Sequence, residues 1–332
     1  MIFLQPLSIQ PLSSTQLHNH PLYCAPATQC PFAFPLARSE QLTSLISEPA
    51  SLTFFDNIPF AIETESMEPM ITVALNAARK AALLLEKATQ HRGPQMIELK
   101  SRNDFVTEVD KAVEKEIIYN LRKAYPTHCF HGEEGGYIEG EDKDSEWIID
   151  PIDGTTNFIN GIPHYAISLA YLHKGKIQHA VILDPSKQEE FTASRGKGAA
   201  LNDRRLRITP RPSLEGALIS TGIPFNGFSF DNIDAYLATL KEIAGQTSGI
   251  RRMGAASLDL AYVAAGRYDG FWEMNLKPWD IAAGLLLVQE AGGFVSDFKG
   301  GNSMLESGNV VCGSPKVFKP LLQIVGKHMR DI

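Results

Sequence analysis

The sequence predicts an α/β protein whose helices and strands pack in layers, because two kinds of hydrophobic pattern recur along the chain. Apolar residues recur at helical spacing over 70–90 and again over 109–118, before Pro126. Two later segments, 257–266 and 281–293, are rich in small apolar residues and end in glycines, which is typical of closely packed helices. Short apolar runs bounded by turn residues predict strands. These runs are 147–149, 166–172 and 180–183.

The first 66 residues differ from the rest of the chain. They hold eight of the twenty prolines, many Ser, Thr and Gln residues, and no hydrophobic periodicity, so we expect 1–66 to be a disordered extension. A natural start at Met67 or Met70 would explain the segment equally well. The remainder, 67–332, has ample apolar material for one large domain, since 44% of the 332 residues are hydrophobic.

The composition argues against several classes of protein. No run approaches the roughly 18 apolar residues that a membrane-spanning helix needs, and the opening residues lack the basic and apolar regions of a signal peptide. Basic and acidic residues nearly balance outside 1–66, so the chain carries no strong nucleic-acid signal. The four cysteines form no C-x-x-C pair, and we expect reduced thiols in a cytoplasmic protein.

The segment Asp150–Thr156 (DPIDGTT) combines features of a metal site and a phosphate site. A strand-like run, 147–149, leads into two acids three residues apart, followed by a glycine and two threonines. Because glycine allows a sharp turn, the three N–H groups after Asp153 are expected to form an anion-binding nest at a helix start. Carboxylates beside such a nest supply the oxygen ligands that Mg²⁺ requires. An Asx turn followed by a helix cap is the structural alternative.

Acids in three other segments strengthen the metal interpretation. Glu133 and Glu134 lie between glycines where a strand could end, although a solvated acidic turn is the simpler interpretation of that segment alone. Asp280 falls in the first turn of an apolar helix, where a helix-capping role is equally expected. Asp110, taken alone, could be a plain surface acid near a helix start. Only the combination of these acids with Asp150–Thr156 indicates a metal site.

Other polar segments give weaker signals. The glycine-rich segment 194–202 lacks the frame of a phosphate-binding P-loop and predicts a hairpin turn. His131 and His164 are expected to be structural, since Mg²⁺ prefers oxygen ligands. Basic residues in and after the hairpin could contact a protein partner, although a solvated hairpin is favoured. These residues are Arg195, Lys197, Arg204, Arg205 and Arg207.

In their order and context, these motifs resemble those of the inositol monophosphatase superfamily of Mg²⁺-dependent, lithium-sensitive phosphatases, over about residues 70–325. The matching segments are Lys100–Asp110, Gly132–Glu134, Asp150–Thr156 and Trp279–Gly284. The resemblance is nearest to the bacterial extragenic-suppressor type. It implies a layered αβαβα sandwich of the sugar-phosphatase type for 67–332. The N-terminal half would cover about 67–210 and the C-terminal half about 211–332.

The resemblance also implies roles for single residues. The ligands of two Mg²⁺ ions would be Glu133, Asp150, the carbonyl of Ile152, Asp153 and Asp280, with Glu133 also serving a weaker third ion. Asp110 and Thr155 would orient and deprotonate the attacking water, while Glu134 and Lys100 would lie behind the ligands. The implied substrate contacts are Ile152, Asp153, Gly154, Thr155, Ala256, Glu273 and Asp280. Arg251, just before the substrate loop, is a further candidate, although a salt bridge at a subunit interface would also suit it.

The reaction implied by the resemblance is hydrolysis of a small phosphomonoester, first of all inositol 1-phosphate, with inhibition by Li⁺. Related activities on fructose 1,6-bisphosphate or 3′-phosphoadenosine 5′-phosphate are alternatives, because the shared metal core says nothing about the alcohol. A homodimer is expected. Suppressor-type relatives are also implicated in transcription antitermination and ribosomal-RNA maturation. A role through binding of transcription elongation factors or RNA polymerase is therefore a second alternative.

Overall fold

The computed structural model describes residues 68–90, 99–224 and 230–332, with the side chains of 99–107 outside the description. These parts belong to one compact unit, which spans Thr64–Ile332. The predicted extension 1–66 and the side chain of Lys100 both lie outside the described residues. None of the helices in the described ranges is long and apolar enough to cross a membrane.

The first of two sheets carries most of the predicted acidic residues. It has eight strands in the order β2-β1-β3-β4-β5-β6-β7-β8, and β1 runs parallel to β3 while the other neighbours are antiparallel. The strands are β1 (His128–Gly132), β2 (Gly136–Ile138), β3 (Asp142–Asp153), β4 (Ala166–His173), β5 (Lys176–Asp184), β6 (Glu189–Ser194), β7 (Gly198–Leu201) and β8 (Arg204–Arg205).

A second sheet has five strands in the order β10-β9-β11-β13-β12. Strands β10, β9 and β11 are parallel, whereas β13 pairs antiparallel with β11 and β12. The bounds are β9 (Leu218–Thr221), β10 (Gly249–Arg251), β11 (Gly270–Glu273), β12 (Phe294–Ser296) and β13 (Val310–Gly313). Because β9, β10 and β11 run in one direction, their carboxyl ends lie at the same edge of the sheet.

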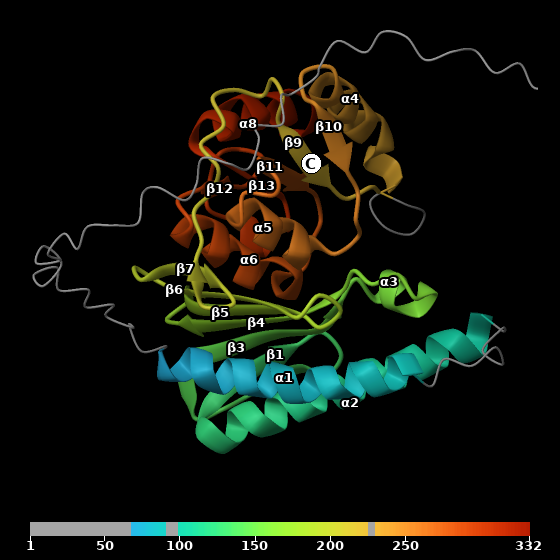
Figure 1. The fold of residues 1–332 in the computed structure, drawn as a ribbon, viewed down its shortest axis with the longest axis vertical. Helices are drawn as coiled ribbons and strands as arrows, with labels where there is room; N and C mark the ends of the chain where they lie inside the picture. Colours follow the sequence, from blue (N-terminus) through green and yellow to red (C-terminus); the bar gives the residue numbers. More distant parts are fainter. Residues whose placement is uncertain (1–67, 91–98, 225–229) are drawn as a thin grey trace, which may run out of the picture. The chain divides into compact units, whose positions relative to one another are not determined.

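Helices separate and cover the two sheets. They are α1 (Pro69–Gln90), α2 (Leu99–Ala124), α3 (Thr155–Asn160), α4 (Ile233–Ala244), α5 (Ala256–Ala264), α6 (Pro278–Glu290), α7 (Met304–Ser307) and α8 (Pro315–Met329), with a 3₁₀ turn over Phe230–Asn232. Helices α1 and α2 pack on one face of the eight-stranded sheet, and α5 and α6 lie between the sheets (Figure 1). Helix α8 packs on the other face of the five-stranded sheet with α4 beside it. The predicted αβαβα order of layers is therefore confirmed.

The predicted elements are confirmed with one difference in length. The runs at 147–149, 166–172 and 180–183 lie in β3, β4 and β5, and the segment 194–202 forms the β6–β7 hairpin. Helix α2, however, begins at Leu99 and not near 109. Polar residues dominate its first ten positions, so no apolar periodicity marks them. Asp110 therefore lies well inside a helix.

The contact between α5 and α6 is unusually close, because Gly284 faces Leu260. A Cβ added to Gly284 would lie 2.5 Å from both the Cβ and the Cδ1 of Leu260. Both helices are almost wholly buried between the sheets, so neither can move away into solvent. The small residues noted in the sequence thus allow two helices to share one thin layer.

We expect Gly284→Val to lower the free energy of unfolding by about 1–3 kcal/mol, because the added side chain overpacks this layer. Urea unfolding followed by circular dichroism measures the change. The matched control is Gly245→Val, since Gly245 is exposed, has a φ of −71° and would place its Cβ in ordinary contact. Equal stability of the two variants would contradict the close-packing argument.

Candidate metal centre

The core of the candidate site is the end of β3, where two carboxylates reach one point. In a regular strand, residues three apart face opposite sides of the sheet. The pairing of β3 with β4 is irregular between Asp150 and Asp153, and this irregularity accompanies the convergence of their side chains. Gly154 follows with a φ of +87°, and a Cβ there would lie 3.0 Å from the carbonyl of His164. Only glycine suits this turn.

Asp280 joins these two acids from the other half of the chain. Carboxylate oxygens of Asp150, Asp153 and Asp280 all lie within 4.8 Å of one another. Asp280 Oδ2 also accepts the N–H of Lys277 at 2.7 Å, so the helix-capping interpretation and the clustering of acids both hold. The carbonyl of Trp279 accepts a hydrogen bond from Ser168 Oγ at 3.3 Å, which joins the start of α6 to β4.

Helix α5 holds Asp153 in place. Oδ2 of Asp153 accepts the N–H of Ser257 at 2.7 Å and also the Ser257 hydroxyl. A carboxylate at a helix N-terminus is stabilised by the free N–H groups and the helix dipole. Beside it, Asn157 Nδ2 donates to the carbonyls of His164 and Met253, each at 2.8 Å. Sequence reasoning missed Ser257 and Asn157.

Glu133 approaches the cluster from β1. Its N–H donates to the carbonyl of Ile149 at 3.2 Å, which extends the β1–β3 ladder by one residue. The residue is exposed at the rim, yet its carboxyl contacts that of Asp150. The turn that carries Glu133 is therefore exposed, as a solvated acidic turn would be, but it also brings one carboxyl to the acid cluster.

Helix α2 contributes two buried acids one turn apart. Asp110 is only 5% exposed, so the interpretation as a surface acid is wrong, and its Oδ1 has no hydrogen-bond partner among the described residues. Glu114, 4% exposed, accepts the N–H groups of Glu134 and Gly135. Glu114 was also missed in the sequence, although its spacing of four from Asp110 places both on one helix face.

Burial and mutual repulsion raise the pKa values of these acids. Burial, with Glu134 and Glu133 nearby, raises the pKa of Asp110 to about 8. Burial raises the pKa of Glu133 and of Asp280 to about 7. The pKa of Asp150 is raised through burial and the charge of Glu133, and that of Asp153 is raised by burial although Ser257 opposes this.

The donor set fits a divalent cation. All the converging groups are oxygen donors, which is the chemistry of a Mg²⁺ site. Ionised carboxylates this close to one another repel unless a cation or protons neutralise them. Asp110 Oδ1, which lacks a hydrogen-bond partner within the described part of the chain, adds a further acceptor from α2.

Thr155 and the backbone of Ile152 complete the turn. Thr155 Oγ1 donates to the carbonyl of Ile152 at 2.8 Å, while the N–H of Ile152 donates to Asp150 Oδ1 at 2.9 Å. The predicted Asx turn is thus present together with the acid cluster. Gly154, Thr155 and Thr156 then open α3, where N–H groups have no partner within the helix.

The residues predicted to meet the alcohol lie at the carboxyl edge of the five-stranded sheet. Burial, with Asp280 and Asp153 nearby, raises the pKa of Glu273 to about 8. Its carboxylate passes so close to Gly222 that a Cβ there would lie 1.7 Å from an oxygen. Ala256 is the first residue of α5 and is buried beside Asp153.

Arg252, which sequence reasoning did not single out, lies close to this region. Arg251 donates to the carbonyl of its neighbour Ile250 at 3.1 Å on the edge strand β10. The charge of Arg252 acts on Glu273, and its Nη1 lies close to Gly254. The substrate role of Arg251 stays a prediction.

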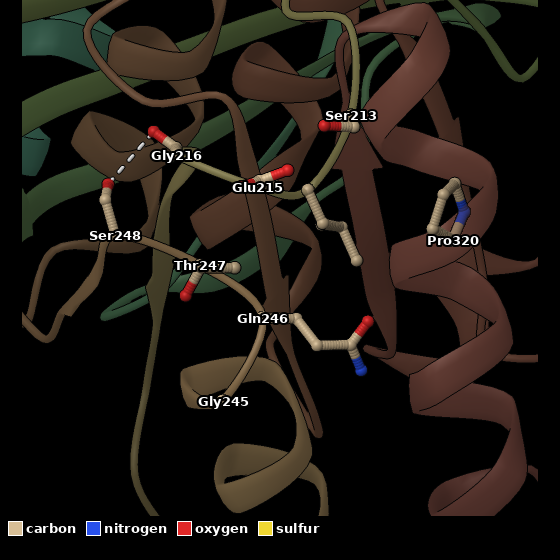
Figure 2. Close-up of a pocket in the computed structure, with 9 residues that line it drawn as sticks. Ser213, Glu215, Gly216, Gly245, Gln246, Thr247, Ser248 and Pro320 are labelled. Atoms are coloured by element: carbon tan, nitrogen blue, oxygen red, sulfur yellow. Dashed lines mark hydrogen bonds between the residues drawn. The ribbon is translucent and has the colours of Figure 1, made fainter.

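A separate groove lies at the opposite edge of the five-stranded sheet. Figure 2 shows its lining, which comes from 213–216 before β9, from 245–248 before β10 and from Pro320 of α8. Ser248 Oγ donates to the carbonyl of Gly216 at 3.0 Å across one side of it. None of the predicted site residues lines this groove.

Comparison with known proteins agrees with the observed fold. Residues 66–330 match the model of the inositol monophosphatase family. The chain therefore belongs to the inositol monophosphatase family, as its motifs predicted.

Within that family, the chain is similar to proteins named Nus factor SuhB. It is 58% identical to that of Pseudomonas aeruginosa over 265 residues, which cover 79% of this chain and 98% of the relative. The relative from Escherichia coli K12 is 48% identical over 267 residues, covering 80% and 97%. The native crystal structure of extragenic suppressor protein suhB from Bartonella henselae superposes with a TM-score of 0.71 at 42% identity, over 79% of this chain and all of that one.

We expect the free energy of unfolding of the protein in EDTA to fall as the pH rises from about 6.5 to 8.5. Carboxyl groups with raised pKa values bind more protons in the folded than in the unfolded state, so their ionisation destabilises the folded state. Histidines with lowered pKa values oppose this trend only below about pH 6.5.

Urea unfolding at several pH values measures this dependence. Asp280→Asn, which removes one charge, should be more stable than the wild-type protein at pH 8.5 and less sensitive to pH. Asp203→Asn is the matched control, because Asp203 is exposed and its φ of +62° suits asparagine. A metal-free stability that rises with pH over this range would rule out the repulsive cluster.

Proposed function

We propose that the protein is a Mg²⁺-dependent phosphatase that hydrolyses a small phosphomonoester, with inositol 1-phosphate as the first candidate. The observation that carries this proposal is the convergence of Asp150, Asp153 and Asp280, from two distant segments, beside the start of α3. A cation site and an anion-binding helix start then adjoin one another. Membership of the inositol monophosphatase family supports the same reaction.

The acids divide between two ions in this proposal. Glu133, Asp150 and the carbonyl of Ile152 would hold the first, and Asp150, Asp153 and Asp280 the second, with Asp150 shared. Glu133 would also serve a weaker third ion, and Li⁺ would inhibit. When bound, the ions supply an activated water and neutralise charge on both the phosphoryl group and the leaving alcohol.

Residues of the chain itself would place and deprotonate the water. Asp110, whose Oδ1 has no hydrogen-bond partner among the described residues, would accept the proton of the attacking water. The Thr155 hydroxyl donates its hydrogen bond to the carbonyl of Ile152. The lone pairs of its oxygen therefore remain available to accept a hydrogen bond from the water. The N–H groups of Gly154 and Thr155, at the start of α3, would bind phosphate oxygens.

The alcohol half of the substrate would meet the second half of the chain. Glu273 could accept hydrogen bonds from hydroxyl groups, Ala256 would line the floor, and Arg251 remains a candidate contact. Related activities on fructose 1,6-bisphosphate or 3′-phosphoadenosine 5′-phosphate differ from the proposal only in this half. The proposed enzyme is a cytoplasmic homodimer, with the catalytic domain over 67–332.

A substrate panel tests the proposal directly. Phosphate release from inositol 1-phosphate, fructose 1,6-bisphosphate and 3′-phosphoadenosine 5′-phosphate is measured with Mg²⁺, with EDTA and with added Li⁺. We expect Mg²⁺-dependent turnover of inositol 1-phosphate that Li⁺ inhibits. Strong preference for the nucleotide or the bisphosphate would overturn the proposed substrate, and activity in EDTA would overturn the metal role.

We expect Asp153→Asn to reduce kcat by about 100-fold or more, equivalent to about 3 kcal/mol, since a lost metal ligand removes transition-state stabilisation. The dependence of rate on Mg²⁺ concentration should shift upward in parallel. Asp203→Asn, remote from the acid cluster in sequence and exposed, should match the wild-type protein. Full activity of Asp153→Asn would refute its role as a ligand.

A second role, as a transcription antitermination and ribosomal-RNA maturation factor that acts through protein binding, is proposed because the relatives at 58% and 48% identity are named Nus factors. Such a role requires contact with transcription elongation factors or RNA polymerase, and does not require turnover. A pull-down with these proteins, repeated with Asp153→Asn, separates the two roles. Binding that survives the substitution would make the second role independent of catalysis, whereas no binding by either form would exclude it.

A further inference from the structure

Glu114 makes a contact that the proposed mechanism does not use. Its Oε2 accepts the N–H of Glu134 at 2.9 Å, and its Oε1 accepts the N–H of Gly135 at 2.7 Å. The two N–H groups are consecutive in the turn between β1 and β2, and the receiving carboxylate comes from α2, twenty residues earlier in the chain. Glu114 is 4% exposed, so little water competes for these bonds.

The turn is shaped to admit this carboxylate. A Cβ added to Gly132 would lie 2.3 Å from Oε2 of Glu114, and one added to Gly135 would lie 2.7 Å from Oε1. Real Cβ atoms do not approach oxygen so closely, so a side chain at either position would displace the carboxylate. The two glycines therefore make room for Glu114, and the two amides bind it.

Glu133 lies inside the turn that Glu114 binds. On its N-terminal side the N–H of Glu133 is fixed to Ile149 of β3, and on its C-terminal side the next two N–H groups are fixed to Glu114. Strand β2, which follows, is a three-residue edge strand whose pairing of Gly136 with Gly132 closes the turn at its base, whereas Glu114 binds the amides within the turn. Glu114 thus supplies the second anchor of the backbone that carries Glu133.

The same helix places Asp110. Residues 110 and 114 are one helical turn apart, so both side chains leave the same face of α2 toward the acid cluster. The negative charge of Glu114 acts on both Asp110 and Glu133. Glu114 is a fourth buried acid beside Asp110, Asp150 and Asp153. Its charge destabilises the folded state, because it adds to the repulsion among its neighbours.

We infer that Glu114 is a positioning residue: its carboxylate fixes the turn 133–135 so that Glu133 is presented to the cation at a set distance from Asp110. This inference rests on the proposed function, since it assumes that Glu133 binds the cation. Glu114 itself touches neither substrate nor cation. It acts through the backbone of the turn, in the way that outer hydrogen-bond partners orient metal ligands.

The test uses Glu114→Gln and two readouts that need no turnover. Glutamine keeps one acceptor oxygen, so at least one of the two N–H groups loses its partner. Hydrogen exchange of the Glu134 and Gly135 amides in the metal-free protein should become about 10-fold faster or more, as expected for loss of a hydrogen bond to a charged group. Calorimetric Mg²⁺ affinity without substrate should fall by about 10–100-fold.

Two further variants sharpen the test. Glu108→Gln removes an equal charge from an exposed position of α2 and should leave both readouts unchanged. Gly132→Ala keeps Glu114 but displaces its carboxylate, so it should weaken Mg²⁺ binding in the same way. Both substitutions disrupt the same contact, which is that of the Glu114 carboxylate with the turn. The double variant Gly132→Ala with Glu114→Gln should therefore lose little more Mg²⁺ affinity than either single variant.

Three outcomes would overturn the inference. Unchanged exchange and Mg²⁺ affinity in Glu114→Gln, with normal binding by the wild-type protein, would refute the role of Glu114 alone. Faster exchange throughout α2 would show that Glu114 supports the fold in general and not the turn. Absence of Mg²⁺ binding by the wild-type protein would refute the proposed function, and the inference with it.

Discussion

The repulsion among clustered carboxylates is the constraint on which the arrangement of the candidate site depends. Five acids converge from four segments, and burial raises the pKa of each of them. Backbone N–H groups at helix starts and turns hold these side chains against that repulsion. Ser257 binds Asp153, Lys277 binds Asp280 and Ile152 binds Asp150. These backbone N–H groups thus stabilise carboxylates that destabilise one another through charge repulsion.

The supports of the site cross the layers of the fold. The ends of β3 and of the turn after β1 belong to the eight-stranded sheet, whereas α5 and α6 lie between the two sheets. Asn157 joins the segment after β3 to the loop before α5, and Ser168 joins β4 to the start of α6. The acid cluster is therefore assembled only when both halves of the chain are folded. The close contact of Gly284 with Leu260 limits how far α6, which carries Asp280, and α5, which carries Ser257, can shift past one another.

The sequence predicted those parts of the site that are local in the chain. The DPIDGTT segment contains its own turn, glycine and acids, and the layered fold followed from hydrophobic periodicity. Two further supporting contacts could not be predicted in this way, because they join residues distant in sequence: Glu114 with Gly135, and Asp153 with Ser257. The start of α2 was missed because its first residues are polar. The effect of Arg252 on Glu273 could not be predicted either, because the fold alone brings these two residues together.

Asp280 uses one carboxylate oxygen to accept the N–H of Lys277, and it contributes an oxygen to the acid cluster. Asparagine could keep the first contact with its amide oxygen while losing the charge that the second requires. Aspartate and asparagine codons differ by a single base. A lineage with this fold can therefore give up its chemistry in one step while α6 still begins at the same residue. The same substitution would leave surfaces that bind other proteins unchanged. The fold and such binding can therefore be inherited without the reaction.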